Sequence, residues 1–131
     1  SEILRHKDND FVTPSEAIKR YKAVAELDFP HYVSWADVER DLSAWLGNRM
    51  QQEALQQIYN LEQNVKLSRN PSLIDEWRKL QTSDHFYYMC TKGGGDGSVH
   101  SYFSPFASPY EAFIVFMNVM KDLEQKLAAP C

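Results

Sequence analysis

The residues best suited to chemistry begin with a charged run in the first third of the chain. Asp37 and Asp41 are four positions apart, and Arg40 stands between them. On a helix, two like charges at that spacing cost about 0.2–0.5 kcal/mol, so a cation such as Arg40 should compensate them. Trp45 and Asn48 continue the same predicted face. An indole beside carboxylates and an amide suits a polyol, because a sugar offers apolar C–H faces together with hydroxyl groups.

A simpler interpretation of this run stays open. Trp45 can pack in the core with Leu42 and Leu46, while the acidic side chains are solvated. Spacing alone favours this simpler interpretation over a binding face.

A second run of interest extends from Thr82 to Met89. Asp84 lies there among aromatic and hydroxyl-bearing residues, and His85 can donate or accept a hydrogen bond near neutral pH. A carboxylate in such surroundings is either well hydrogen-bonded or has a perturbed pKa. Asp84 is therefore a candidate site residue, with ordinary helix capping by Ser83 or Asp84 as the alternative.

Other kinds of site find little support in the sequence. The run Gly93–Gly97 has neither a preceding strand nor the Gly-Lys-Ser/Thr of a phosphate-binding loop, and Asp96 lacks the alternating Asp/Asn partners of a calcium loop. The histidines show no His-x-x-x-His or His-x-His spacing. They are His6, His31, His85 and His100. We expect no metal site and no cofactor.

The sequence predicts that helices position these runs. Thr13-Pro14-Ser15-Glu16 is typical of a capped helix start, and the apolar spacing that follows predicts about three turns, to Ala25. Ser34 can cap a second helix, which would carry both Asp37 and Trp45.

Three further helices are predicted in the rest of the chain. A clean apolar stripe runs from Met50 to Val65 and is stopped by Asn70-Pro71-Ser72. The next helix begins near Leu73. Ser108-Pro109-Tyr110-Glu111 repeats the capping pattern before a strong apolar stripe that reaches Leu127.

Residues Lys92–Pro109 carry four of the five glycines and two of the six prolines, so a long irregular loop is predicted there. Such loops are uncommon unless they are functional. Strand signals are sparse, and only Phe86–Met89 and Val99–Phe103 could form short strands. The predicted fold is an all-α helical bundle with one long Gly/aromatic-rich loop, as a single domain over residues 1–131.

Composition narrows the function classes. The chain has 131 residues, 14 Lys+Arg against 18 Asp+Glu and a net charge of −4, which disfavours nucleic-acid partners. Its longest mostly apolar stretch, Ala112–Val119, is far shorter than a membrane span. Cys90 and Cys131 form no Cys-x-x-Cys pair, so neither a disulfide framework nor a thiolate zinc site is expected. Cys90 is interpreted as a small hydrophobe, and the cysteine usage fits a cytoplasmic location.

Longer runs carry a resemblance to a known family. Ser34–Asn48 and Trp77–Met89, together with Phe11–Glu16, Val99–Pro105 and Ser108–Phe113, resemble the C-terminal region of α-amylases of glycoside hydrolase family 57. The resemblance covers nearly the whole chain.

The resemblance implies a helical domain that follows a (β/α)₇ barrel in a retaining, α-glucan-active enzyme. The nucleophile Glu and the acid/base Asp of that family lie on the barrel, so no catalytic residue is expected in this chain. The family's last conserved region lines the active-site cleft, and its Ser/Asn-Asp-aromatic pattern matches Ser83-Asp84, with His85 in the third place.

The substrate-binding residues expected on this basis hydrogen-bond to glucose hydroxyls, stack on sugar faces or border the cleft. They are Asp84, His85, Trp45, Tyr87, Tyr88, Asp41, His100 and Tyr102. The expected partners are the barrel of the same polypeptide and a maltooligosaccharide. The isolated fragment should expose an apolar patch and could dimerise through it.

Two alternatives come from other classes. The chain could be a free-standing, non-catalytic module that binds glucan or, through its Gln- and Glu-rich third helix, another protein. An independent small enzyme is the weakest alternative, because no nucleophile–base pair can be assembled from the sequence.

Overall fold

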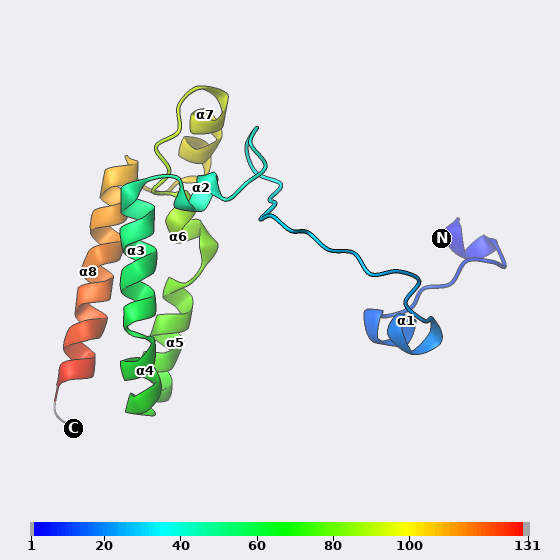
Figure 1. Cartoon of the computed structure of the whole chain (residues 1–131), viewed down its shortest axis with the longest axis horizontal. Coiled ribbons are helices and arrows are strands. Elements are labelled where there is room, and N and C mark those ends of the chain that lie inside the picture. Colours follow the sequence, from blue (N-terminus) through cyan, green and yellow to red (C-terminus); the bar gives the residue numbers. More distant parts are fainter. Residues whose placement is uncertain (1, 130–131) are drawn as a thin grey trace. The chain divides into compact units, whose positions relative to one another are not determined.

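The computed structural model describes residues 2–129, and over this range its regular elements are helices (Figure 1). The all-α prediction is therefore confirmed. The chain divides into two compact units, Ser1–His31 and Tyr32–Cys131, which we call the N-terminal and C-terminal units. No helix in the described part of the chain is long and apolar enough to cross a membrane.

The N-terminal unit contains a short 3₁₀ helix, η1 (Ile3–Arg5), and α1 (Pro14–Arg20). The predicted capping box is present: the Thr13 hydroxyl accepts from the Glu16 amide, and the Glu16 carboxylate accepts from the Thr13 amide at 2.8 Å. The predicted third turn is wrong, because the backbone becomes extended at Tyr21. Within this unit α1 buries no residue, so no packing sustains a longer helix.

The C-terminal unit starts with a correction to the second predicted helix. Only α2 (Ser43–Leu46) forms, and the preceding residues make turns. Asp37 and Arg40 have φ values of 58° and 55°, in the left-handed region, which a right-handed helix cannot include. Asp37 and Asp41 are therefore not neighbours on a helix face.

Two of the following helices begin at sites that the sequence predicts: Asn70 caps α5 (Pro71–Leu80), and Ser108 caps α8 (Pro109–Ala128). Asn48, expected on the face of the second helix, instead caps α3 (Arg49–Asn60). The predicted stripe from Met50 to Val65 is confirmed, although the helix breaks at Leu61 and continues as α4 (Glu62–Ser68).

The long loop predicted over Lys92–Pro109 is wrong in its main part, because α7 (Gly94–Phe103) occupies it. Gly94 starts this helix with a φ of +65°, and Gly97 passes so close to the Lys92 carbonyl that a Cβ there would lie 2.3 Å from the oxygen. The two possible strands also belong to helical or turn structure: Val99–Phe103 lies in α7, and Phe86 and Tyr87 lie in α6 (Ser83–Tyr87).

The core of the C-terminal unit lies between α3, α4, α5, α6 and α8. In Figure 1, α3 and α8 lie side by side, with α5 beside them. The Trp77 indole donates to the Ile58 carbonyl at 2.8 Å, which satisfies the polar atom of a large buried side chain. The apolar residues of this core are Ala54, Ile58, Leu61, Val65, Trp77, Leu80, Phe86, Met89, Ala112, Phe116, Met120 and Leu123.

Gln51 joins the core to the elements that carry the candidate site. Its side chain is fully buried and donates to the carbonyls of Ala44 and Phe86 at 2.8 and 2.9 Å, while its oxygen accepts from the Asn48 amide at 3.0 Å. A second, smaller apolar cluster of Ala36, Ala44 and Tyr87 lies next to these contacts. Gln51 thereby connects α2, α3 and α6.

Candidate functional site

The candidate site is an aromatic cavity of about 410 Å³ in the C-terminal unit. Helix α2 contributes Trp45, α6 and the residue after it contribute side chains that include Asp84, and α7 closes another side. Trp35, from the turns before α2, completes the lining. The lining residues are Trp35, Trp45, Ser83, Asp84, Tyr87, Tyr88, Val99 and Phe103.

Aromatic rings dominate this cavity and differ in their exposure. Tyr87 is buried and packs against Trp45, with ring centroids 5.9 Å apart and planes tilted by 46°. Trp35 and Phe103 are 78% and 62% exposed. Exposed aromatic surface next to a buried aromatic wall is typical of a binding surface rather than of a core.

Polar groups accompany the rings. The Asp84 carboxylate is exposed and, within residues 2–129, has no hydrogen-bonding or ion-pair partner in the protein. No side chain caps α6, so the capping alternative for Ser83 and Asp84 is not what the structure shows. Burial raises the pKa of Tyr87, and the nearby carboxylates and Cys90 add to this effect. The Tyr87 phenol therefore keeps its proton and can both donate and accept.

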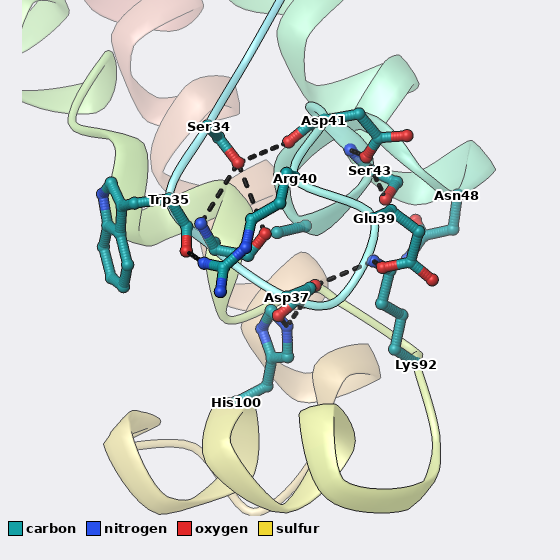
Figure 2. Close-up of polar contacts among 12 residues, drawn as sticks. Ser34, Trp35, Asp37, Glu39, Arg40, Asp41, Ser43, Asn48, Lys92 and His100 are labelled. Carbon is teal, nitrogen blue, oxygen red and sulfur yellow. Dashed lines mark hydrogen bonds and ion pairs between the residues drawn. The ribbon is translucent and has the colours of Figure 1, made fainter.

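Close to the cavity, an ion-pair network is centred on the buried side chain of Asp37 (Figure 2). The Asp37 side chain is only 5% exposed; one oxygen lies 2.8 Å from the Lys92 ammonium, and both lie 3.1 Å from His100 Nε2. Lys92 also contacts the exposed Glu39 carboxylate at 2.7 Å. An ionised carboxylate can only accept hydrogen bonds, so His100 Nε2 is the donor in this contact and carries the proton.

The pKa values of this network follow from its contacts. Burial raises the pKa of Asp37, but the hydrogen bonds from Lys92 and His100 lower it by more, so the carboxylate titrates below its ordinary range. Burial likewise lowers the pKa of Lys92, while hydrogen bonds to Asp37 and Glu39 raise it, and the net effect is well above the usual value. Both groups are therefore charged at neutral pH.

The network connects to the cavity through His100. Its ring stacks on that of Tyr87, with centroids 3.9 Å apart and planes inclined by 32°. His100 is itself buried, and its Nδ1 atom has no partner within residues 2–129.

Three carboxylates of this region are close enough to share a cation. One oxygen from each of Asp37, Glu39 and Asp96 lies within 4.8 Å of the others. The sequence spacing does not reveal this cluster, because folding brings Asp96 of α7 to the turns before α2. The Lys92 ammonium contacts two of the three and supplies a compensating charge.

Four of the expected substrate-binding residues, Trp45, Asp84, Tyr87 and Tyr88, line the cavity together. Trp45 is half-buried, so it is neither a simple core residue nor fully exposed.

The other four lie outside this lining. Asp41 is exposed and accepts from the Ser43 amide at 2.7 Å, and His85 packs against Phe116, with centroids 5.7 Å apart. His100 lies behind Tyr87, and Tyr102 is 82% exposed on α7.

Sequence reasoning missed Trp35 and Phe103 as site residues, together with the pairing of Asp37 with Lys92 and His100. An available signal was the position of Trp35, an aromatic two residues before a carboxylate. The pairing itself has no local signal, because its members are far apart in the chain.

In comparisons with known proteins, the chain is similar to one part of a larger protein. A protein named "Putative alpha-amylase" from Methanocaldococcus jannaschii is 37% identical over 133 residues. The match covers 94% of this chain and 28% of that protein. No family model matches the chain. No solved structure matches it either.

Proposed function

We propose that this chain is the C-terminal helical part of a retaining α-glucan-active hydrolase of glycoside hydrolase family 57. In this proposal it packs on the catalytic barrel of the same polypeptide and contributes substrate contacts to the cleft. The similarity to a protein named as an α-amylase supports the enzyme class, and the match to 28% of that protein fits a part of a longer chain. The aromatic cavity is the observation that carries the proposal.

The cavity has the chemistry that a glucan requires. Exposed faces of Trp35 and Phe103 can cover the C–H surfaces of glucose rings, and Trp45 forms the wall beneath them. The Asp84 carboxylate and the Tyr87 phenol can bind the hydroxyl groups. In this account the chain orients the glucan, while the barrel supplies the two carboxylates that retaining hydrolysis needs about 5–5.5 Å apart.

The solvent-facing half of α8 offers a surface for the barrel. Tyr110, Ile114, Val115 and Val119 are each at least 40% exposed there. They form two pairs four residues apart, Tyr110–Ile114 and Val115–Val119, and exposed apolar side chains of this kind can be buried against a protein partner. The same surface could support a dimer of the isolated chain.

One observation favours a second candidate, a free-standing glucan-binding module. The cavity brings together aromatic rings and a carboxylate from residues 35–103, so this chain by itself presents groups that suit a sugar. The sequence of the gene upstream of the Ser1 codon separates the two: a continuous reading frame into a barrel supports the enzyme, whereas a start codon at that point supports the module.

The binding itself can be tested by calorimetric titration with maltoheptaose, with cellohexaose as the control ligand. Trp45→Ala should weaken maltoheptaose binding about tenfold, because removing one buried aromatic surface costs about 1.5 kcal/mol. Tyr59→Ala is the matched control, since Tyr59 is an exposed aromatic residue of α3 outside the cavity. Equal losses of maltoheptaose affinity in the two variants would contradict binding at the cavity. In a longer enzyme, the same variants are compared through KM.

A further inference from the structure

The turns that carry Trp35 form a closed loop, which we call the Trp35 loop (residues 34–41). The Ser34 amide donates to the Arg40 carbonyl at 2.8 Å, and the Ser34 hydroxyl donates to the Asp41 carbonyl at 2.6 Å. The Arg40 guanidinium donates to the Trp35 carbonyl (Figure 2). These contacts all lie within the loop, so they fix its shape. They do not attach it to the rest of the C-terminal unit.

The loop has an unfavourable backbone. Asp37 and Arg40 both adopt left-handed φ values without being glycine. This region is strained for residues other than glycine, although Asp tolerates it better than most residues. Conformations of this kind persist when the surrounding structure holds them in place.

The Asp37 carboxylate attaches the Trp35 loop to the rest of the unit and so stabilises this backbone. Its side chain is 5% exposed, and its partners are Lys92, two residues before α7, and His100 of α7. Charge-assisted hydrogen bonds in a buried position are about twice as strong as neutral ones. The neighbouring Glu39 carboxylate contacts the same lysine but is 50% exposed, so its pairing is screened by water.

The same helix forms a wall of the aromatic cavity. Val99 and Phe103 of α7 line it, and His100 stacks on the Tyr87 ring that faces it. Trp35 is 78% exposed and has little packing of its own to fix it. Its place at the cavity therefore depends on the attachment of its loop to α7.

We propose that Asp37 is a positioning residue for ligand binding: it clamps the Trp35 loop onto α7 and so holds the Trp35 indole at the cavity. This inference rests on the proposed function for its ligand but not for its geometry. Asp37 touches no substrate in this account and acts through Trp35.

The test compares Asp37→Asn with Glu39→Gln in the full 131-residue chain. Asn keeps the size of Asp and tolerates left-handed φ, so the first variant removes the buried charge with little backbone penalty. Glu39→Gln removes an exposed carboxylate charge that contacts the same lysine, Lys92. Incorporation of 5-fluorotryptophan gives one ¹⁹F resonance each for Trp35, Trp45 and Trp77, and Trp77 reports on the core.

In Asp37→Asn, the Trp35 resonance should move more than half of the way toward that of the free amino acid, while the Trp77 resonance stays in place. Maltoheptaose affinity should fall about 5–10-fold, or about 1–1.4 kcal/mol. Glu39→Gln should leave the Trp35 resonance in place and change affinity less than about twofold, as expected for an exposed pair. If Asp37→Asn does not fold, Lys92→Gln removes one partner of the clamp and should give the same pattern in weaker form.

The possible results separate the two proposals. An unmoved Trp35 resonance in a folded Asp37→Asn or Lys92→Gln protein overturns the positioning role, even if the parent chain binds maltoheptaose. A displaced Trp35 resonance supports the positioning role, even if the parent chain binds no maltoheptaose; that second result would contradict the glucan ligand alone.

Discussion

Trp45 on α2 and Tyr87 on α6 hold their ring centroids 5.9 Å apart, and both rings line the aromatic cavity. Gln51 fixes the two helices that carry them, since its amide donates to the carbonyls of Ala44 and Phe86, each one residue before an aromatic. The rings are therefore positioned by buried hydrogen bonds as well as by packing. A preorganised wall of this kind lowers the entropy that binding would otherwise cost.

Asp84 tests the polar side of the cavity. Asp84→Ala should raise the KM for maltooligosaccharides about 3–10-fold in the full enzyme, because a hydrogen bond to a charged group contributes about 1.5 kcal/mol or less at an exposed site. The melting temperature should not change, since the carboxylate makes no contact that stabilises the described fold. Asp75→Ala, which removes an exposed carboxylate on α5, is the control. Unchanged kinetics in Asp84→Ala would rule out its substrate role.

Gln51 tests the link between the core and the site. Gln51→Met keeps the volume but leaves the buried carbonyls of Ala44 and Phe86 without donors, so the free energy of unfolding should fall by about 2–4 kcal/mol. Urea unfolding measures this loss. Gln56→Met is the matched control on the exposed side of α3 and should stay within about 0.5 kcal/mol of the wild type. Similar values for the two variants would show that the buried amide contributes nothing special.

The close approach at Gly97 predicts a sharp contrast between two glycines of α7. Gly97→Ala places a Cβ 2.3 Å from the Lys92 carbonyl oxygen, so the backbone must shift and stability should fall by about 1–3 kcal/mol. A Cβ at Gly95 meets nothing within 4 Å, so Gly95→Ala should be neutral or stabilising, as alanine favours helices. Thermal unfolding of both variants gives the comparison. A stable Gly97→Ala protein would contradict this packing at the start of α7.

The Asp37 network predicts how stability depends on pH. The pKa of Asp37 is lower in the folded protein than in the unfolded chain, so its contribution is complete above the unfolded value of about 3.9. That contribution disappears as the pH falls through the folded value. The difference in unfolding free energy between the wild type and Asp37→Asn should shrink as the pH falls below about 4. Lys92, His100, Glu39 and Asp96 surround the carboxylate and are retained in the variant.

Urea unfolding at several pH values measures this difference. Asp75→Asn, which changes an exposed carboxylate on α5, should differ little from the wild type at any pH. A gap for Asp37→Asn that remains the same down to pH 2 would contradict the assigned ion pairs.

Local signals predicted the starts of several helices. Thr13, Asn70 and Ser108 each cap a helix through an oxygen that accepts a backbone amide two or three residues on, and this contact needs no distant partner. The apolar stripe from Met50 to Val65 was equally easy to predict, because its spacing matches one buried face of a helix.

Long-range contacts explain what the sequence could not predict. The Trp35 loop replaces a predicted helix because Asp37 pairs with Lys92 and His100, more than fifty positions away. Helix α7 forms in a glycine-rich segment of low helix propensity because Gly97 fits against the Lys92 carbonyl and His100 is anchored by Asp37. The sequence indicated that Trp45, Tyr87 and Tyr88 belong to the site. That Trp35 and Phe103 line the same cavity depends on the long-range contacts of the Trp35 loop with α7, which the sequence does not reveal.

The most direct test of the central claim uses the three tryptophan indole N–H resonances of the ¹⁵N-labelled chain during titration with maltoheptaose. Trp35 and Trp45 line the cavity, whereas Trp77 lies in the core and donates to the Ile58 carbonyl. We expect the Trp35 and Trp45 resonances to shift with one shared dissociation constant and the Trp77 resonance to stay unchanged. No shift at Trp35 and Trp45 with maltoheptaose, or an equal shift with cellohexaose, would contradict an α-glucan site in this cavity.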